Sequence, residues 1–211
     1  MTILGKQSLL ISILLSLVFV SKTQSQTLIV DDTANLKVGV YRTFKEFRYN
    51  SPSITTEFTV RPEEKRFDYA PSEFKDSSRH TIYYLLLPES YTITDTIWGF
   101  CDGKNIYINT WWSTYSPKGT YERLEYIGRY CLFFKWQPGG YKKPPRICRI
   151  AININNGLAF DPDILSHSDL KQILEKDTYL YNKYKQDKER KAKSFYYLKL
   201  YSEKHKDQIK P

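Results

Sequence analysis

The chain has 211 residues, of which 32 are Lys or Arg and 23 are Asp or Glu, and its formal net charge is +9. Aromatic side chains make up 16% of the residues, with 18 Tyr, 11 Phe and 4 Trp against 1 Met. So many aromatic residues exclude an intrinsically disordered chain and favour strands, where flat side chains pack on a pleated surface. The length suits one ordinary domain with room for an appendage.

Residues 1–25 predict a secretory signal that is removed after export. Lys6 precedes the apolar run LLISILLSLVFV (9–20), and the polar stretch SKTQSQ follows it. An apolar run of about 12 residues is shorter than the roughly 20 that a membrane-spanning helix needs. Small residues at Thr23 and Ser25 suit the peptidase, so we expect cleavage near Ser25 and a periplasmic or secreted protein. An uncleaved anchor is the alternative, and we expect no transmembrane segment in the mature chain.

Residues 41–87 predict a short helix followed by two strands. Thr43 and Glu46 have the spacing of a capping box, which marks the start of the helix. ITTEFTV (54–60) alternates and is rich in β-branched residues, which predicts a strand. TIYYLLL (81–87) is typical of a buried strand.

The segment TIWGFCDGKNIYINTWW (96–112) predicts a β-hairpin. Two apolar runs flank Asp102-Gly103, and Gly accepts the positive φ that a tight two-residue turn demands. YERLEYIGRYCLFFKW (121–136) has apolar residues on both faces, which predicts one long central strand covered on both sides. After the turn segment QPGGYKKPP, RICRIAININ (146–155) alternates and predicts a further strand.

The last part of the chain predicts two helices. Leu170, Ile173 and Leu174 lie on one face of the first helix, and the second begins at Asp177. Because the middle of the second helix, QDKERKAK, is wholly polar, this helix is either solvent-bridging or broken into two pieces. Residues 183–206 hold nine Lys or Arg against three acids, so their net charge is +6.

These patterns predict an α+β fold. We expect a twisted antiparallel sheet of about five or six strands, with a short N-terminal helix and a C-terminal helical tail. The expected organisation is a signal peptide at 1–25, a β-rich domain at 26–160 and a basic helical tail at 161–211 packed on the same domain.

Three cysteines remain in the mature chain, at Cys101, Cys131 and Cys148. The midpoint between Cys131 and Cys148 falls at Gly139-Gly140, so a hairpin folded there would place the two side chains opposite each other. Opposed side chains on antiparallel strands are within reach of a disulfide, which an oxidising compartment favours. Cys131 and Cys148 are therefore the better pair if a disulfide forms, and three buried reduced thiols are the alternative.

Trp111 and Trp112, with Tyr115 nearby, form the predicted binding platform. Aromatic faces stack on sugar rings or on partner side chains. Adjacent residues on a strand point to opposite sides, so one indole would be buried and the other exposed. In the alternative, both indoles fill the gap between the sheet and the tail.

The sequence contains no motif of a catalytic, cofactor or metal site, and we expect none of the three. His80 is the histidine best placed to lie near a cleft, although a surface histidine is the more common role. Cys101 beside Asp102 has no evident histidine partner. Glycoside cleavage depends on the distance between two carboxyl groups in space, and spacing in the sequence does not determine this distance. The carboxylates that could supply such a pair are Glu89, Asp95, Asp102, Glu122 and Glu125.

Four segments together carry a resemblance to a known family: YRTFKEF…NSPS (41–53), WGFCDGKNIYIN (98–109), GRY (128–130) before an aromatic strand, and NNGLAF before a helix. In this combination the chain resembles an uncharacterised family of exported proteins from Gram-negative bacteria, over roughly residues 38–205. The resemblance implies export and a single domain, and it implies no catalytic residues.

We therefore expect an exported, non-enzymatic binding or interaction protein of the bacterial envelope. Its partner would be an envelope protein, a glycan or an anionic headgroup, and not a nucleic acid. The first alternative is a small envelope hydrolase that acts on glycan or peptide. The second is a structural subunit that docks through the basic helical tail. A solvated helix face without a partner would also explain the basic residues.

Overall fold

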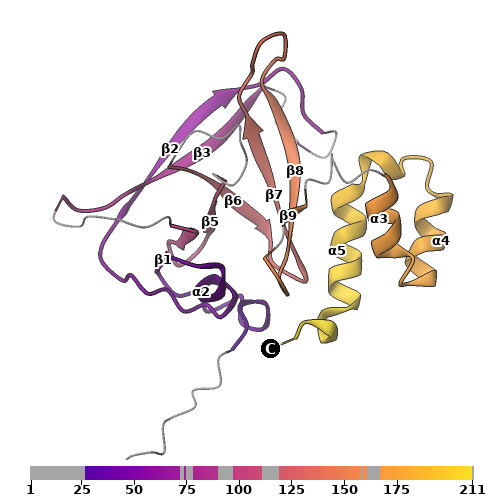
Figure 1. Ribbon diagram of the computed structural model, residues 1–211, viewed down its shortest axis with the longest axis horizontal. Helices are drawn as coiled ribbons and strands as arrows, with labels where there is room; N and C mark the ends of the chain where they lie inside the picture. The colour runs from indigo at the N-terminus through magenta and orange to yellow at the C-terminus, as the bar shows by residue number, and fades with distance from the viewer. Residues whose placement is uncertain are drawn as a thin grey trace, which may run out of the picture.

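The computed structural model describes residues 27–71, 74, 78–89, 97–110, 119–157, 159–160 and 167–210. The expected signal peptide and the predicted platform of Trp111, Trp112 and Tyr115 therefore lie outside the described residues. The described part of the chain forms an antiparallel sheet with a group of helices beside it (Figure 1). This arrangement confirms the prediction of an α+β fold with an antiparallel sheet.

The sheet is larger than the five or six strands expected, with nine strands among the described residues. One reason is that the segment 121–136 turns back at Gly128 and supplies two strands where one was predicted. Another is that three strands are only two or three residues long, too short for alternation to reveal them. The strands are β1 (Gly39–Tyr41), β2 (Thr59–Arg66), β3 (Arg79–Leu86), β4 (Gly99–Cys101), β5 (Ile106–Asn109), β6 (Thr120–Tyr126), β7 (Tyr130–Gln137), β8 (Arg146–Asn153) and β9 (Ala159–Phe160).

The helical elements begin and end largely at polar residues. Thr43 is the N-cap of α2, and its hydroxyl oxygen accepts a hydrogen bond from the Glu46 N–H at 3.2 Å, as the capping pattern predicted. The second predicted helix is broken within its polar middle. The α-helices are α2 (Phe44–Arg48), α3 (His167–Leu174), α4 (Thr178–Gln186) and α5 (Ser194–Lys204), and the 3-10 turns are η1 (Ile29–Asp31), η2 (Arg190–Ala192) and η3 (Lys206–Gln208).

Strand β6 is shared by three neighbours, and this creates a fork in the sheet. The main strand order is β1-β4-β5-β6-β7-β8-β9, and β3 also pairs with β6 and carries β2 on its outer edge. Tyr121 pairs with Asn109 of β5 on one side and with Tyr83 of β3 on the other. Further along the edge that β3 occupies, β6 pairs with β7 from Leu124 onward. The β2–β3 pair and the β7–β8 pair therefore diverge from one edge of β6 (Figure 1).

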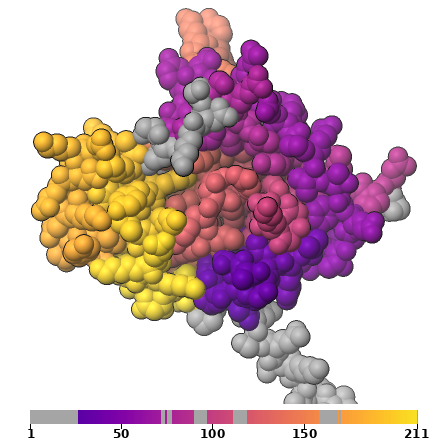
Figure 2. Space-filling model, turned by 180° about the vertical axis from the view of Figure 1, so that it is seen from behind, coloured from indigo at the N-terminus to yellow at the C-terminus, as the bar shows by residue number. Residues whose placement is uncertain are grey.

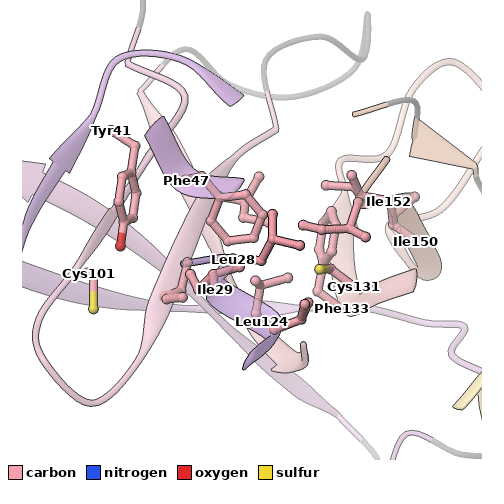
Figure 3. Packing of buried hydrophobic residues seen from close by; sticks show 14 of the residues in the cluster. Leu28, Ile29, Tyr41, Phe47, Cys101, Leu124, Cys131, Phe133, Ile150 and Ile152 are labelled. Atoms are coloured by element: carbon pink, nitrogen blue, oxygen red, sulfur yellow. The ribbon is translucent and has the colours of Figure 1, made fainter. Parts of the chain in front are cut away.

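The largest hydrophobic cluster lies on one face of the sheet. Strand β8 contributes Cys148, Ile150 and Ile152 to it, and Ile154 follows directly after the strand; these are the four residues that the alternation placed inward. Figure 3 shows Ile150, Ile152, Cys131 and Phe133 packed with Leu124, while Phe47 and Leu28 approach from the N-terminal segment. The short N-terminal helix thus closes this face of the sheet.

A second cluster joins the sheet to the helices. On strand β7, Tyr130 and Leu132 face α3, α4 and α5, while Cys131 and Phe133 face the first cluster. Strand β7 is therefore buried on both faces, as predicted for the aromatic part of this segment. The backbone N–H of Tyr130 also donates to the Ser202 hydroxyl of α5 at 3.1 Å.

No disulfide joins the candidate pair Cys131 and Cys148, and both thiols are buried, as is that of Cys101, in agreement with the alternative of three buried thiols. The hairpin of β7 and β8 forms, but its register places Cys131 opposite Ile152 and Cys148 opposite Lys135. The turn is centred between residues 141 and 142, two positions beyond Gly139-Gly140. Because of this shift, the two cysteines lie at different positions along the hairpin and do not face each other.

The turn between β4 and β5 also differs from its prediction. Cys101 pairs with Ile106, so the loop contains four residues, 102–105, where a two-residue turn was expected. Gly103 has the expected positive φ of 92°. The longer loop forms because the Asp102 carboxylate accepts hydrogen bonds from the N–H groups of Lys104 at 2.8 Å and Asn105 at 2.6 Å.

Candidate functional site

A buried histidine–glutamate pair lies at the fork between β3 and β7. Glu122 of β6 is 2% exposed, and its carboxylate oxygens face two different strands. One oxygen lies 2.6 Å from Nε2 of His80 on β3. The other accepts a hydrogen bond from the Trp136 backbone N–H of β7 at 2.7 Å. The sequence singled out His80 and Glu122 separately, and the fold brings them together.

The fork explains why a carboxylate is buried here. If the β6–β7 register continued, Trp136 of β7 would pair with the backbone of β6. The two strands have diverged before this position, so that pairing does not form. An unpaired backbone N–H is costly in the interior, and the Glu122 side chain replaces the missing carbonyl acceptor. Complete burial raises the pKa of Glu122, although His80, the Trp136 N–H and the charge of Lys135 oppose the rise. Glu122 thus joins β3 to β7 across the divergence.

A small pocket of about 170 Å³ lies beside this pair. The Phe74 ring stands at the fork, with its centroid 5.5 Å from that of His80 and 5.0 Å from that of Phe134. Two arginines of the pocket already contact carboxylates: Arg79 lies 2.8 Å from Glu64 and Arg123 lies 3.0 Å from Glu125. The remaining lining residues are Thr81 and Tyr83. A histidine oriented by a buried carboxylate can act as a general base, but here the carboxylate also has a structural role.

Two other candidates from the sequence, Asp102 and Cys101, have structural roles in the described fold. The Asp102 carboxylate organises the loop 102–105 and also accepts from the Tyr107 hydroxyl at 2.9 Å. Burial raises the pKa of the Cys101 thiol, which also accepts a hydrogen bond from the Gly103 N–H at 3.3 Å. A buried thiol with a raised pKa is a poor nucleophile, because the thiolate is the reactive form. Of the other acids that the sequence singled out, Asp95 lies outside the described residues.

A second site lies at the tip of the β7–β8 hairpin, and we call it the tip groove. Two tyrosines line it and remain exposed, Tyr69 to 66% and Tyr141 to 90%. The groove has a volume of about 660 Å³. Its lining residues are Tyr69, Gln137, Pro138, Gly139, Gly140, Tyr141, Lys143, Pro144 and Arg146. In Figure 2 the hairpin tip projects beyond the rest of the body.

Backbone hydrogen bonds hold both walls of the tip groove. The Ile147 N–H donates to the Tyr69 carbonyl at 2.7 Å, and the Asp68 N–H donates to the Pro145 carbonyl at 2.9 Å. These bonds fix the segment that follows β2 alongside the start of β8. At the tip, Gly140 and Lys143 exchange two backbone hydrogen bonds of 2.8 and 3.0 Å. The two tyrosines, far apart in the sequence, therefore face one preformed groove.

The charges around the tip groove are mainly positive. Lys143 and Arg146 line it, and the Lys142 ammonium lies 5.2 Å from the centroid of the Tyr141 ring. Arg146 Nε donates to the Gln137 side-chain oxygen at 2.6 Å, which orients the guanidinium along the groove wall. Lys142 has a φ of 61°, in the left-handed region that a residue with a side chain rarely adopts. Strained backbone of this kind is often retained where it presents a functional surface.

Only partial signals of this site are present in the sequence. Tyr141 stands in the segment QPGGYKKPP, which was interpreted as a turn and not as a surface for binding. Tyr69 lies in a stretch that shows no periodicity. The signal that could have drawn attention to the tip is an aromatic residue next to two lysines in a short Gly/Pro turn, because apolar side chains are uncommon at such positions.

Comparisons with known protein families, with curated proteins and with solved structures find no match to this chain. No helix among the described residues is both long and apolar enough to cross a membrane. Within the same residues, no group of three or more His, Cys, Asp or Glu side chains is arranged to hold a metal ion.

Proposed function

We propose that this chain is an exported, non-enzymatic binding protein of the bacterial envelope and that the tip groove is its binding site for an acidic carbohydrate. The observation that carries the proposal is the pair of exposed tyrosines, Tyr69 and Tyr141, on one groove with Lys143 and Arg146 in its walls. Aromatic faces stack on the apolar faces of sugar rings, and cations attract the carboxylate or phosphate groups of acidic glycans.

The shape of the groove supports a polymer more than a small molecule. It is open at the hairpin tip, and its walls are held by backbone hydrogen bonds, so little conformational freedom is lost on binding. The two tyrosine rings offer separate stacking positions along one surface. A ligand made of several sugar rings can use both positions at once.

Isothermal titration calorimetry of the processed protein against oligogalacturonate, with a neutral maltooligosaccharide as the comparison, tests this proposal. We expect binding of the acidic oligosaccharide that weakens as salt is raised. Tyr141→Ala and Tyr69→Ala should each lower the affinity about 3- to 10-fold, the effect of losing one aromatic stacking contact. Tyr179→Ala is the matched control, because Tyr179 on α4 is 68% exposed and lies away from the groove.

The result that would overturn the proposal is equal affinity of Tyr141→Ala and the unchanged protein, or equal affinity for neutral and acidic oligosaccharides. The hydrolase alternative is supported by a separate observation, the His80–Glu122 pair beside the pocket at the fork. A reducing-end assay during the same titration distinguishes the two functions. Release of new reducing ends that His80→Ala abolishes would replace the binding proposal with the hydrolase.

A further inference from the structure

The outer surface of the helical layer combines exposed tyrosines with lysines. Helices α4 and α5 are antiparallel neighbours, since Asp177 before α4 contacts Lys204 at the end of α5. Tyr179 and Lys183 of α4 lie near Lys204 and Tyr196 of α5, and we call these four residues the α4–α5 face. All four are exposed, and Tyr179 is exposed to 68% and Tyr196 to 44%.

Each exposed tyrosine of this face is paired with an ammonium group. Lys183 Nζ donates to the Tyr196 hydroxyl at 3.1 Å and lies 5.5 Å from the centroid of its ring. Lys204 Nζ lies 5.3 Å from the centroid of the Tyr179 ring. Beside them on α4, Lys185 Nζ lies 4.4 Å from the ring of the half-buried Tyr181. The face therefore repeats one unit, an aromatic ring with a cation next to it.

The surrounding charge is strongly positive, with a net charge of +6 over residues 183–206. Two of the three acids in that range, Asp187 and Glu189, share the ammonium of Lys193, which directly precedes α5. These two acids lie beside η2 and the third, Glu203, lies on α5, while the lysines extend along both helices. Figure 1 places α4 at the outer edge of the molecule, separated from the sheet by α3 and α5. The positive face is thus presented outward.

We propose that the α4–α5 face binds the surface of a membrane that contains anionic phospholipids. Tyrosine and lysine are the side chains suited to the headgroup layer, because each carries an apolar part that can enter the interface and a polar end that stays in water. Lysines near an anionic leaflet contribute additively to attraction. The protein lies on the surface and does not cross the bilayer. The proposal is independent of the tip groove, which lies at the end of a different pair of elements.

Vesicle co-sedimentation of the processed protein tests the proposal. The N-terminus is first checked by mass spectrometry, because an uncleaved apolar segment 9–20 would itself bind lipid. We expect binding to vesicles of phosphatidylglycerol in phosphatidylcholine, loss of that binding at high salt, and no binding to phosphatidylcholine alone. Lys183→Gln should lower the partition constant about fivefold and Lys183→Glu about 30-fold, from the contribution of one charge near an anionic surface.

The control variant changes the net charge by the same amount as Lys183→Glu but at a position away from the α4–α5 face. Lys104→Glu in the β4–β5 loop alters the total charge as Lys183→Glu does, so it should leave binding nearly unchanged if the face is specific. Tyr179→Ser and Tyr196→Ser should each weaken binding a few-fold, and Tyr141→Ser at the tip should not. Thermal melting of every variant shows whether it is folded.

Three outcomes would overturn the proposal. One is equal weakening by Lys104→Glu and Lys183→Glu, which would indicate attraction by net charge alone. The second is binding to neutral vesicles with the same strength. The third is no binding of the folded, processed protein to phosphatidylglycerol vesicles, and binding to DNA or to a purified envelope protein instead would identify another partner. Loss of oligosaccharide binding without loss of vesicle binding would contradict only the function proposed for the tip groove.

Discussion

Replacement of Glu122 should show how much the fork in the sheet depends on one carboxylate. Glu122→Ala removes the acceptor of the Trp136 N–H and leaves His80 without its partner. Removing one member of a buried ion pair costs roughly 3–5 kcal/mol, and an unpaired buried N–H alone costs about 1–3 kcal/mol. The two effects overlap at one site, so we expect a loss of about 4 kcal/mol in the free energy of unfolding.

Glu122→Gln separates the hydrogen bond from the charge. The amide oxygen of glutamine can still accept from the Trp136 N–H, while its amide nitrogen faces the His80 ring. Burying the charged carboxylate carries a desolvation penalty. Glutamine removes this penalty, which partly offsets the stabilisation that is lost with the charge. The expected change is about 1 kcal/mol, well below that of alanine. Urea unfolding, followed by intrinsic tryptophan fluorescence to which Trp136 beside the fork contributes, measures both variants.

The dependence on pH gives the second test of Glu122. Burial raises its pKa in the folded protein, so the carboxyl group binds its proton more tightly there than in the unfolded chain. Its contribution to stability is then complete below the unfolded pKa, near 4.3, and decreases as the pH rises through the raised folded pKa. The stability of wild type relative to Glu122→Gln should therefore fall with rising pH. A difference that grows with pH, or an alanine variant that loses less than about 1 kcal/mol, would refute this account of the fork.

Three further predictions concern the helical layer, the hairpin tip and the thiols. Burial by itself raises the pKa of Asp177, but hydrogen bonds from Lys204, the Leu180 N–H and His205 lower it to about 2. The stabilisation by Asp177 is therefore complete above the unfolded pKa of about 3.9 and lost as the pH falls toward 2. Asp177→Asn keeps the N-cap, so in acid titrations followed by circular dichroism it should lose this dependence of stability on pH. It should also destabilise the protein less than Asp177→Ala does. Equal losses of stability in the two variants would exclude a role for the cap. Lys142→Gly should raise the melting temperature, because it relieves about 1 kcal/mol of left-handed strain at φ 61°, and a lowered melting temperature would contradict this. Burial raises the pKa of Cys131 to about 12, so iodoacetamide should label it only after unfolding, whereas rapid labelling of the native protein would show that the site is open.

Local signals in the sequence predicted the elements whose causes are local. Thr43 and Asp177 cap their helices through side-chain oxygens, and each pattern is contained within four residues. The alternation of Cys148, Ile150 and Ile152 predicted which face of β8 is buried, because a strand has a period of two. Such patterns do not depend on what the segment packs against.

Pairing between distant segments could not be predicted in the same way. The register of β7 and β8 depends on which residues occupy the turn, and a difference of two positions is enough to keep the candidate pair Cys131 and Cys148 apart. The contact of His80 with Glu122 joins residues 42 apart in the sequence, and it exists only because β3 and β7 meet the same edge of β6. Tyr69 enters the tip groove through backbone bonds to β8 that no side-chain pattern encodes.

The sharing of β6 also sets an order in which the chain can fold. The pairs β6–β7 and β7–β8 connect neighbouring segments, whereas β3 reaches β6 only after residues 85–119 have closed into a loop. Closing a longer loop costs more entropy, so we expect the β6–β7–β8 meander to assemble before the β2–β3 pair docks onto it. During that interval the edge of β6 and the buried carboxylate are open to water. The last docking event thus completes the interior and the tip groove in one step.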